Sequence, residues 1–220
     1  ASYRFYLEGT SLPMLSAKEA WAGLPEAYDA LHVGTLGLVV EPTASVLETL
    51  VDHAAADHVI MLDPNCRPAV VTDLPAFRDR ILRMIDKADL IKVSEDDVSF
   101  LFPDGGFDEV IEGAVARGAI VLHTAGADPI DVYAHDGTTQ VVPAQGDIVD
   151  TVGAGDIFGA TVLWALLENG WGKDLRWGVD QVAPAVRTGA TAAHIACQRA
   201  GAEPPTLAEL KAYLTTTAVT

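Results

Sequence analysis

Hydrophobic residues along the chain follow two alternating patterns. Short continuous apolar runs predict buried strands, and they lie at residues 31–33, 58–62, 89–93 and 119–122. Between these runs, apolar residues recur at helical spacing, at residues 43–54, 77–88 and 110–118. Strands alternating with helices form right-handed crossovers that place successive strands parallel. The pattern therefore predicts an α/β fold with a mostly parallel sheet sandwiched by helices.

The N-terminal residues show a different period. Residues 2–8 alternate apolar and polar side chains, which predicts a half-exposed strand. Ser16 and Glu19 have the spacing of a capping box, which predicts the start of a short helix. Leu31 to Val33 is then expected to enter a glycine turn at Gly34 and Gly37.

The C-terminal half begins with a hairpin signal. Residues 131–134 and 138–142 flank His135-Asp136-Gly137, which predicts two antiparallel strands. A long apolar helix follows residue 156 and is expected to end near Asn169-Gly170. Residues 175–197 predict one or two further helices, and residues 206–214 predict a terminal helix.

Four polar clusters follow predicted strands at the point where each strand ends. They are Asp63–Arg67, Ser94–Asp97, Thr124–Gly126 and Asp150–Asp156. In open α/β sheets, ligands bind outside the carboxyl ends of the strands. We therefore expect these clusters to gather at one edge of the sheet.

The stretch from Asp150 to Phe158 carries the strongest chemical signal. It reads Asp-Thr-Val-Gly-Ala-Gly-Asp-Ile-Phe and leads into the long apolar helix. Gly153 and Gly155 leave main-chain N–H groups open at a helix start, where an anion is stabilised. A carboxylate beside them, Asp156, is suited to take a proton from a hydroxyl that attacks a phosphate. The alternative is that Asp156 is only a carboxylate in the first turn of a buried helix.

Composition narrows the class of protein. The 220 residues are 50% hydrophobic, which excludes a disordered chain, and the net charge of −17 argues against a nucleic-acid partner. No apolar run is long enough to span a bilayer, and we expect no membrane association and a cytoplasmic location. The two cysteines lack metal-site spacing, so we expect them to be reduced and structural.

The run from Asp150 to Phe158 closely resembles the signature of the ribokinase-like (PfkB) carbohydrate kinases, Asp-Thr-x-Gly-Ala-Gly-Asp-x-Phe. Every fixed position of that signature is present. The resemblance implies that Asp156 is the catalytic base. It also implies that the amides of Gly153, Ala154 and Gly155 form the anion hole for the transferred phosphate.

Two further segments resemble the fructokinase branch of this family. Asp63-Pro-Asn-Cys-Arg67 is similar to its Asp-Pro-Asn-x-Arg segment, which implies substrate contacts by Asn65 and Arg67. Alternatively, the segment is an Asx-turn in which Arg67 pairs with an acid. Ser94 to Asp97 lies where the family has Asn-x-x-Glu, implying that Ser94 contacts the nucleotide and Asp97 holds Mg²⁺ through water. The alternative is a helix N-cap followed by acidic residues.

The remaining segments concern the nucleotide and a monovalent cation. Thr124-Ala-Gly126 matches the family's Thr-x-Gly nucleotide loop, although Pro129 stands where a second glycine is usual. The alternative is an ordinary strand exit. Arg199-Ala-Gly201-Ala202 resembles the family's Arg-x-Gly-Ala near the adenine pocket, where Ala190 replaces a usual polar residue. K⁺ would be bound by carbonyls near Asp150 and Val152.

The resemblance implies an ATP-dependent sugar kinase that acts on fructose. Ribose, 2-keto-3-deoxygluconate or a nucleoside is an alternative substrate, and a non-catalytic nucleotide- or sugar-sensing protein is an alternative from another class. ATP and Mg²⁺ are expected, with K⁺ as a further cation. We expect the chain to be the C-terminal two-thirds of such a kinase. Residues 1–12 would be a remnant of the β lid, and residues 13–220 would form the α/β domain with the ATP site. The full-length protein would form a homodimer through the lid.

Overall fold

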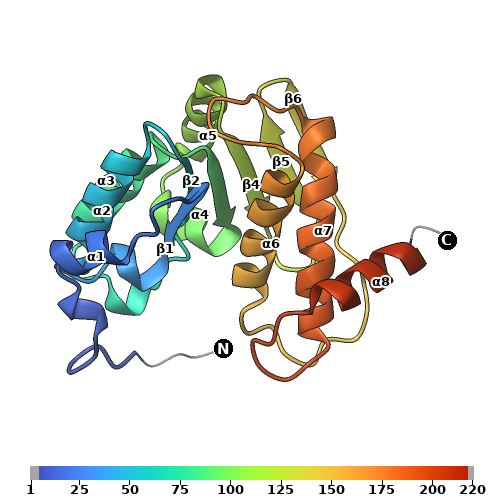
Figure 1. The fold of residues 1–220 in the computed structure, drawn as a ribbon, viewed down its shortest axis with the longest axis horizontal. Helices are drawn as coiled ribbons and strands as arrows, with labels where there is room; N and C mark the ends of the chain where they lie inside the picture. The colour runs from blue at the N-terminus through green and yellow to red at the C-terminus, as the bar shows by residue number, and fades with distance from the viewer. Residues whose placement is uncertain (1–4, 218–220) are drawn as a thin grey trace. The chain divides into compact units, whose positions relative to one another are not determined.

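The computed structural model describes residues 5–217 of the chain. The chain forms two compact units, residues 1–119 and residues 120–220. Each unit is built from its own strands and helices (Figure 1), and we describe the two in turn.

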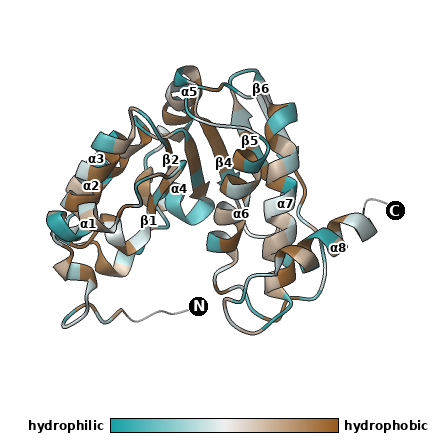
Figure 2. Cartoon of the chain, in the orientation of Figure 1, coloured by the Kyte–Doolittle hydropathy of each residue, from teal (hydrophilic) through white to brown (hydrophobic). Residues whose placement is uncertain are grey.

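Three parallel strands form the centre of the first unit: β1 (Ala30–Gly34), β2 (Val59–Asp63) and β3 (Leu90–Ser94). β1 pairs in register with β2, from Ala30 opposite Val59 to Gly34 opposite Asp63. β2 pairs in turn with β3, with Leu62 opposite Ile91. All five residues of β2 are buried, and its apolar residues 59–62 take the brown, hydrophobic end of the colours in Figure 2. A strand that is buried on both faces needs a continuous apolar run, as β2 has.

Helices flank the strands of this unit, one of them before β1 and the others after the strands. They are α1 (Ala17–Gly23), α2 (Thr43–Ala54), α3 (Leu74–Ile85), α4 (Glu95–Leu101) and α5 (Phe107–Arg117). Short 3₁₀ turns are η1 (Leu12–Met14), η2 (Thr35–Leu38) and η3 (Pro68–Val70). Arg80 and Arg83 of α3 both donate to the Glu48 carboxylate of α2, so charged side chains join these two helices. The capping box predicted at Ser16 and Glu19 is present at the start of α1.

The first residues of the chain differ from the prediction. Of the strand expected over residues 2–8, residues 2–4 lie outside the described part, and residues 5–7 have no regular structure. No strand begins before Ala30 in the described residues. β1 was expected to be buried, but only Val33 is. Gly34 belongs to this strand rather than to a turn.

The second unit contains three antiparallel strands and three helices. β4 (Ile120–Thr124) pairs with β5 (Ile130–Ala134), and β5 pairs with β6 (Gly137–Val141) through the predicted hairpin. The helices are α6 (Ala154–Glu168), α7 (Val179–Cys197) and α8 (Leu207–Thr217). Residues 175–197 therefore contain one helix, and the signature helix ends at Asn169 as predicted.

Helices α6 and α7 lie side by side along their length (Figure 1). They pack tightly at Gly189 of α7, where an added Cβ would lie 2.5 Å from Val162 Cγ2 and 2.9 Å from the Phe158 carbonyl oxygen. The hairpin tip holds the start of α7, because Asp136 Oδ1 accepts a hydrogen bond from Val179 N at 2.9 Å. Both contacts fix the position of α7 against its own unit.

The α/β fold predicted from the sequence is confirmed, with parallel strands followed by helices in the first unit. Each predicted helix is present within a few residues of its expected bounds. In the part of the chain that the structure describes, no helix combines the length and apolar character needed to cross a membrane.

The close contact at Gly189 yields a test of the packing. We expect Gly189→Ala to destabilise the protein by about 1–3 kcal/mol, because overpacking outweighs the gain in helix propensity. Gly113→Ala in α5 is the matched control, since its Cβ would meet only the flexible end of Arg117. That variant should be as stable as the parent or more stable. Urea unfolding midpoints measure both, and equal midpoints for the two variants would contradict the packing argument.

Candidate active site

The signature helix α6 begins at a glycine in a conformation that other residues rarely adopt. Gly153 is the N-cap residue, with φ of +78°. A Cβ at this position would also lie 2.6 Å from the Ala202 side chain. Glycine is therefore required here for two reasons, the left-handed backbone and the space.

The main-chain amides at this helix start are only partly used by the chain itself. Ala154 N donates to Thr151 O at 3.2 Å, and Ile157 N makes the first helical bond to Gly153 O at 2.9 Å. Among the described residues, the N–H groups of Gly153 and Gly155 have no acceptor within hydrogen-bond distance. Two of the three amides predicted to form the anion hole are thus available, and that of Ala154 is engaged in a turn.

Asp156 lies in the first turn of α6 and is exposed, whereas the next two residues, Ile157 and Phe158, are buried. The carboxylate is therefore outside the hydrophobic core. Because the Gly153 N–H has no acceptor among the described residues, the helix start differs from the reciprocal capping boxes of α1 and α4. Asp156 does lie in the first turn, as the alternative interpretation has it, and its role as a base stays a prediction.

Asp150 joins the signature loop to a segment about fifty residues later in the chain. Its Oδ1 accepts from Val152 N at 3.0 Å, and its Oδ2 accepts from Gly201 N at 2.8 Å. These two hydrogen bonds, first that of Val152 and then that of Gly201, lower the pKa of the Asp150 carboxyl below its usual value. The ionised carboxylate thus holds the loop against the segment around Gly201.

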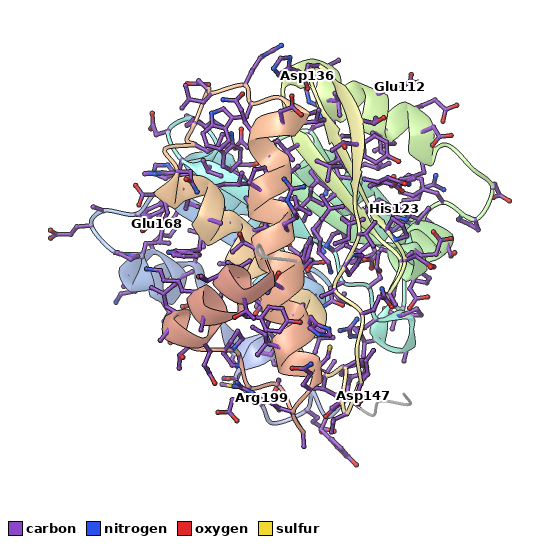
Figure 3. The ribbon with its side chains drawn as sticks, turned by 90° about the vertical axis from the view of Figure 1, so that its right-hand side faces the viewer. Glu112, His123, Asp136, Asp147, Glu168 and Arg199 are labelled. Carbon is purple, nitrogen blue, oxygen red and sulfur yellow. The ribbon has the colours of Figure 1, made fainter. Side chains whose placement is uncertain are left out.

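The segment from Arg199 to Ala202 is fixed at its other residues too. Arg199 Nη2 donates to Glu209 Oε1 of α8 at 2.5 Å, and Ala202 lies against Gly153. Figure 3 shows Arg199 at the end of α7 opposite Asp136. The structure therefore brings together Asp150–Asp156 and Arg199–Ala202, two of the three segments of this unit that were predicted to belong to the site. Ala190 of α7, at 6% exposure, is part of the buried core.

The predicted nucleotide loop lies at the exit of β4. Thr124 is the last residue of the strand, and Gly126 has φ of +62° in a turn closed by Asp128 N donating to Ala125 O at 3.1 Å. The turn explains the glycine by its backbone conformation. A role of Thr124 and Gly126 in nucleotide binding stays a prediction.

In the first unit, acidic residues converge at the carboxyl ends of β2 and β3. Asp63 and Lys92 form a buried ion pair, with Lys92 Nζ 3.0 Å from Oδ1 and 2.9 Å from Oδ2. Asp97 is 2% exposed. Its Oδ2 accepts from Ser94 N at 2.9 Å and from Ser94 Oγ at 2.6 Å, and its Oδ1 accepts from Cys66 N at 2.6 Å. The predicted gathering of the polar clusters therefore holds within this unit.

Ser94 and Asp97 form a reciprocal capping box at the start of α4, which was the alternative interpretation of Ser94. Asp97 is also the anchor of the loop after β2 through Cys66. Burial and the neighbouring Asp97 carboxylate raise the pKa of the Cys66 thiol. Cys66 is therefore a neutral thiol at physiological pH, consistent with the expected structural role.

Asn65 and Arg67 lie on this loop. Asn65 has φ of +40°, in the left-handed region that asparagine tolerates better than most residues. Arg67 Nη1 donates to the carbonyl oxygens of Asn65 at 3.1 Å and Cys66 at 3.0 Å. In the alternative interpretation Arg67 pairs with an acid, but in the described residues its guanidinium is instead bound by carbonyls of its own loop. Contacts of Asn65 and Arg67 with a substrate stay predictions.

A metal ion would have few ligands here. Among the described residues no group of three or more His, Cys, Asp or Glu side chains could hold one. Three hydrogen bonds already occupy the Asp97 carboxylate, which has about four acceptor positions. Asp97 therefore fits contact with a metal through water better than direct ligation, and Mg²⁺ commonly keeps several waters.

The contacts of two residues in these clusters, Lys92 and Ala202, were not predicted from the sequence. Lys92 was read only as part of a strand, although a lysine within an apolar run was a signal that it needs a buried acid. Ala202 was read only as part of a family pattern. Its contact with Gly153 depends on the way α7 returns the chain to the signature loop, which no local pattern reveals.

Comparison with known proteins agrees with the geometry. Residues 10–209 match the model of the pfkB family carbohydrate kinases. The chain belongs to this family. A fructokinase of Rhizobium leguminosarum bv. trifolii is 38% identical over 170 residues, which are 76% of this chain and 51% of that protein. The chain thus spans about half the length of the curated relatives it matches.

Solved structures of kinases share the fold. A fructokinase of Vibrio cholerae, solved with fructose, ADP and calcium ion, has a TM-score of 0.75 at 24% identity, covering 91% of this chain and 64% of that one. An aminoimidazole riboside kinase of Salmonella enterica, solved with aminoimidazole riboside and an ATP analog, has a TM-score of 0.77 at 20% identity, covering 96% and 70%. At these identities the likeness supports the ribokinase-like fold.

The lowered pKa of Asp150 yields a test of the loop. A group whose pKa is lower in the folded state contributes stability above its unfolded pKa, about 3.9 for Asp, and loses it as the pH falls through the folded pKa. We expect Asp150→Asn to lower the urea unfolding midpoint at pH 7, and the deficit to shrink below about pH 4. Asp147→Asn, an exposed change in the same segment, is the control and should have little effect. A deficit that is constant from pH 7 to pH 3 would rule out the ionised carboxylate as its cause.

Proposed function

We propose that this chain is the catalytic part of an ATP-dependent sugar kinase that transfers the γ-phosphate to a hydroxyl of fructose. The observation that carries the proposal is the exposed Asp156, one residue after Gly155 at a helix start where two glycine N–H groups are available. The 38% identical relative named a fructokinase supports fructose as the sugar.

The proposed chemistry follows from this arrangement. As the sugar oxygen attacks the γ-phosphorus, its proton passes to an Asp156 carboxylate oxygen, and the bond from phosphorus to the β-phosphate bridging oxygen breaks. The N–H groups of Gly153 and Gly155 donate to the oxygens of the transferred phosphoryl group, where negative charge must be stabilised. The positive end of the α6 dipole adds to this stabilisation.

Mg²⁺ would neutralise charge on the phosphates when bound with ATP. In this chain Asp97 would face it through water, and Ser94 would be positioned by the same capping box. K⁺ would be held by carbonyls near Asp150 and Val152. The Asp150 carboxylate itself is committed to the N–H groups of Val152 and Gly201, so its part would be to shape the loop.

The remaining assignments complete the proposal. Thr124 and Gly126 would contact the nucleotide, and Asn65 and Arg67 would contact the substrate beside the transferred phosphate. Arg67 would have to give up, or share, its hydrogen bonds to the loop carbonyls to do so. A homodimer formed through residues 1–12 and a cytoplasmic location stay predictions.

Replacement of Asp156 tests the base directly. In the full-length protein we expect Asp156→Asn to lower kcat by a factor of about 10²–10⁴ while ATP still binds, because the amide cannot accept the proton. Asp180→Asn is the matched control, since Asp180 is likewise an exposed acid in the first turn of a long helix, α7. A coupled assay of ADP release measures kcat, and calorimetry measures the binding of ATP. An unchanged kcat in Asp156→Asn would remove this residue from the mechanism.

The substrate is tested by a screen of ADP release with fructose, ribose, 2-keto-3-deoxygluconate and nucleosides. We expect the highest kcat/KM for fructose. A higher value for another sugar would replace fructose in the proposal. Nucleotide binding without any phosphorylated product would instead favour the sensor.

A further inference from the structure

The ion pair between Asp63 and Lys92 has no assigned part in the reaction. Both side chains are almost completely buried, with Asp63 at 3% and Lys92 at 4% exposure. The other ion pairs described in this unit are formed by side chains that are 15% to 69% exposed. Asp63 and Lys92 therefore form an unusual pair that needs an explanation of its own.

Stability alone does not explain a buried ion pair. Removing two charges from water costs free energy that their attraction only partly restores, so apolar side chains of similar volume are often as stabilising or more so. An apolar pair would fit the surroundings here, because Met61 and Leu90, the paired residues two positions earlier on the same face of these strands, are themselves buried. The two charges must therefore have a role that apolar side chains could not fill.

The position of the ion pair in the fold indicates the role of the two charges. Asp63 is the last residue of β2, and the loop with Asn65 and Arg67 begins at the next residue. Both carboxylate oxygens contact Lys92 Nζ, which holds the end of the strand in one orientation. A little further on, Thr35 N donates to Pro64 O at 3.0 Å and Asp97 accepts from Cys66 N. The loop is thus held at its start, and again just before and just after Asn65.

Asn65 itself requires such support. Its φ of +40° is a sparsely populated conformation, which persists only when the surroundings determine it. Close packing contributes as well, since a Cβ on Gly34 would lie 2.0 Å from the Asp63 carbonyl oxygen. A small rotation at Asp63 would be passed directly to Pro64 and Asn65.

We propose that Lys92 is a positioning residue, which acts through Asp63 to hold the loop of residues 64–67 in the orientation that presents Asn65 and Arg67 to the substrate. This inference rests on the proposed sugar-kinase function for its catalytic consequence. Its structural part, the ordering of the loop by the ion pair, can be measured without any activity.

The test uses the double variant Asp63→Leu/Lys92→Met in the full-length protein, with both single variants. Each single change leaves a buried unpaired charge and can prevent folding, whereas the double variant removes both charges with little change of shape. The control is Asp52→Leu/Lys87→Met, which removes an ion pair of the same residue types from the surface of the same unit.

We expect the double variant to keep a urea midpoint close to that of the parent, and kcat/KM for the sugar to fall about 100-fold or more, as displaced substrate contacts typically cause. The affinity for ATP should change much less than KM for the sugar. The control variant should keep the urea midpoint and the kcat/KM of the parent. A double variant that keeps its kcat/KM would overturn the catalytic part of the inference.

Cys66 supplies the measurement that does not depend on activity. Its thiol lies within the loop, is partly buried and has a raised pKa, so it should react slowly with iodoacetamide in the parent. Loosening of the loop in the double variant should increase the labelling rate of Cys66, followed by mass spectrometry of its peptide, by about tenfold or more. The same rate in the parent and the double variant would overturn the inference. If the parent phosphorylates no sugar, the proposed function fails and the labelling rate alone decides.

Discussion

The contact of Gly153 with Ala202 is the constraint on which the candidate site depends. A left-handed glycine lets the chain enter α6 abruptly, and the absence of a side chain lets the segment after α7 lie directly against the turn. The consequence is a helix start at which two N–H groups point away from the chain's own acceptors in the described residues. A larger residue at position 153 would change both the backbone turn and the packing against Ala202. The anion-binding geometry of the loop therefore depends directly on its local structure.

Charged side chains have different surroundings in the two units. In the signature loop the carboxylate of Asp150 is kept ionised by two main-chain donors and links segments that are distant in sequence. In the first unit, Asp97 is buried and satisfied by three donors, and Asp63 is buried against an ammonium group. In all three cases the carboxylate accepts hydrogen bonds or an ion pair that order a loop.

Much of this could be predicted from the sequence. The apolar periods identified the strands and helices, because burial of β2 or of one face of α3 requires those residues in that order. The glycines and Asp156 were recognisable because the geometry of a helix start follows from a few neighbouring residues. The strand expected over residues 2–8 failed in its described part, since alternation shows which residues suit a strand but not whether a neighbouring strand is present.

The contacts between distant segments could not be predicted in the same way. Nothing near Asp150 indicates that Gly201 will donate to it. The Arg67 guanidinium binds carbonyls only one and two residues away, but the local sequence does not show that it will bind them rather than an acid. Such contacts depend on how long helices return the chain, and on competition among several acceptors at similar distances. Local patterns contain neither kind of information.

Helix α7 is held at both of its ends, by Asp136 of the hairpin at Val179 and by the hydrogen bonds of Val149 N and Asp150 N to Cys197 O. It is also packed tightly against α6 at Gly189. Helix α7 therefore connects the hairpin tip to the signature loop as a rigid element. Substitutions at the hairpin tip, more than a dozen residues before the signature, would therefore alter the phosphate-binding turn. An evolutionary change at the tip would constrain the choice of residues at this turn, and the reverse also holds.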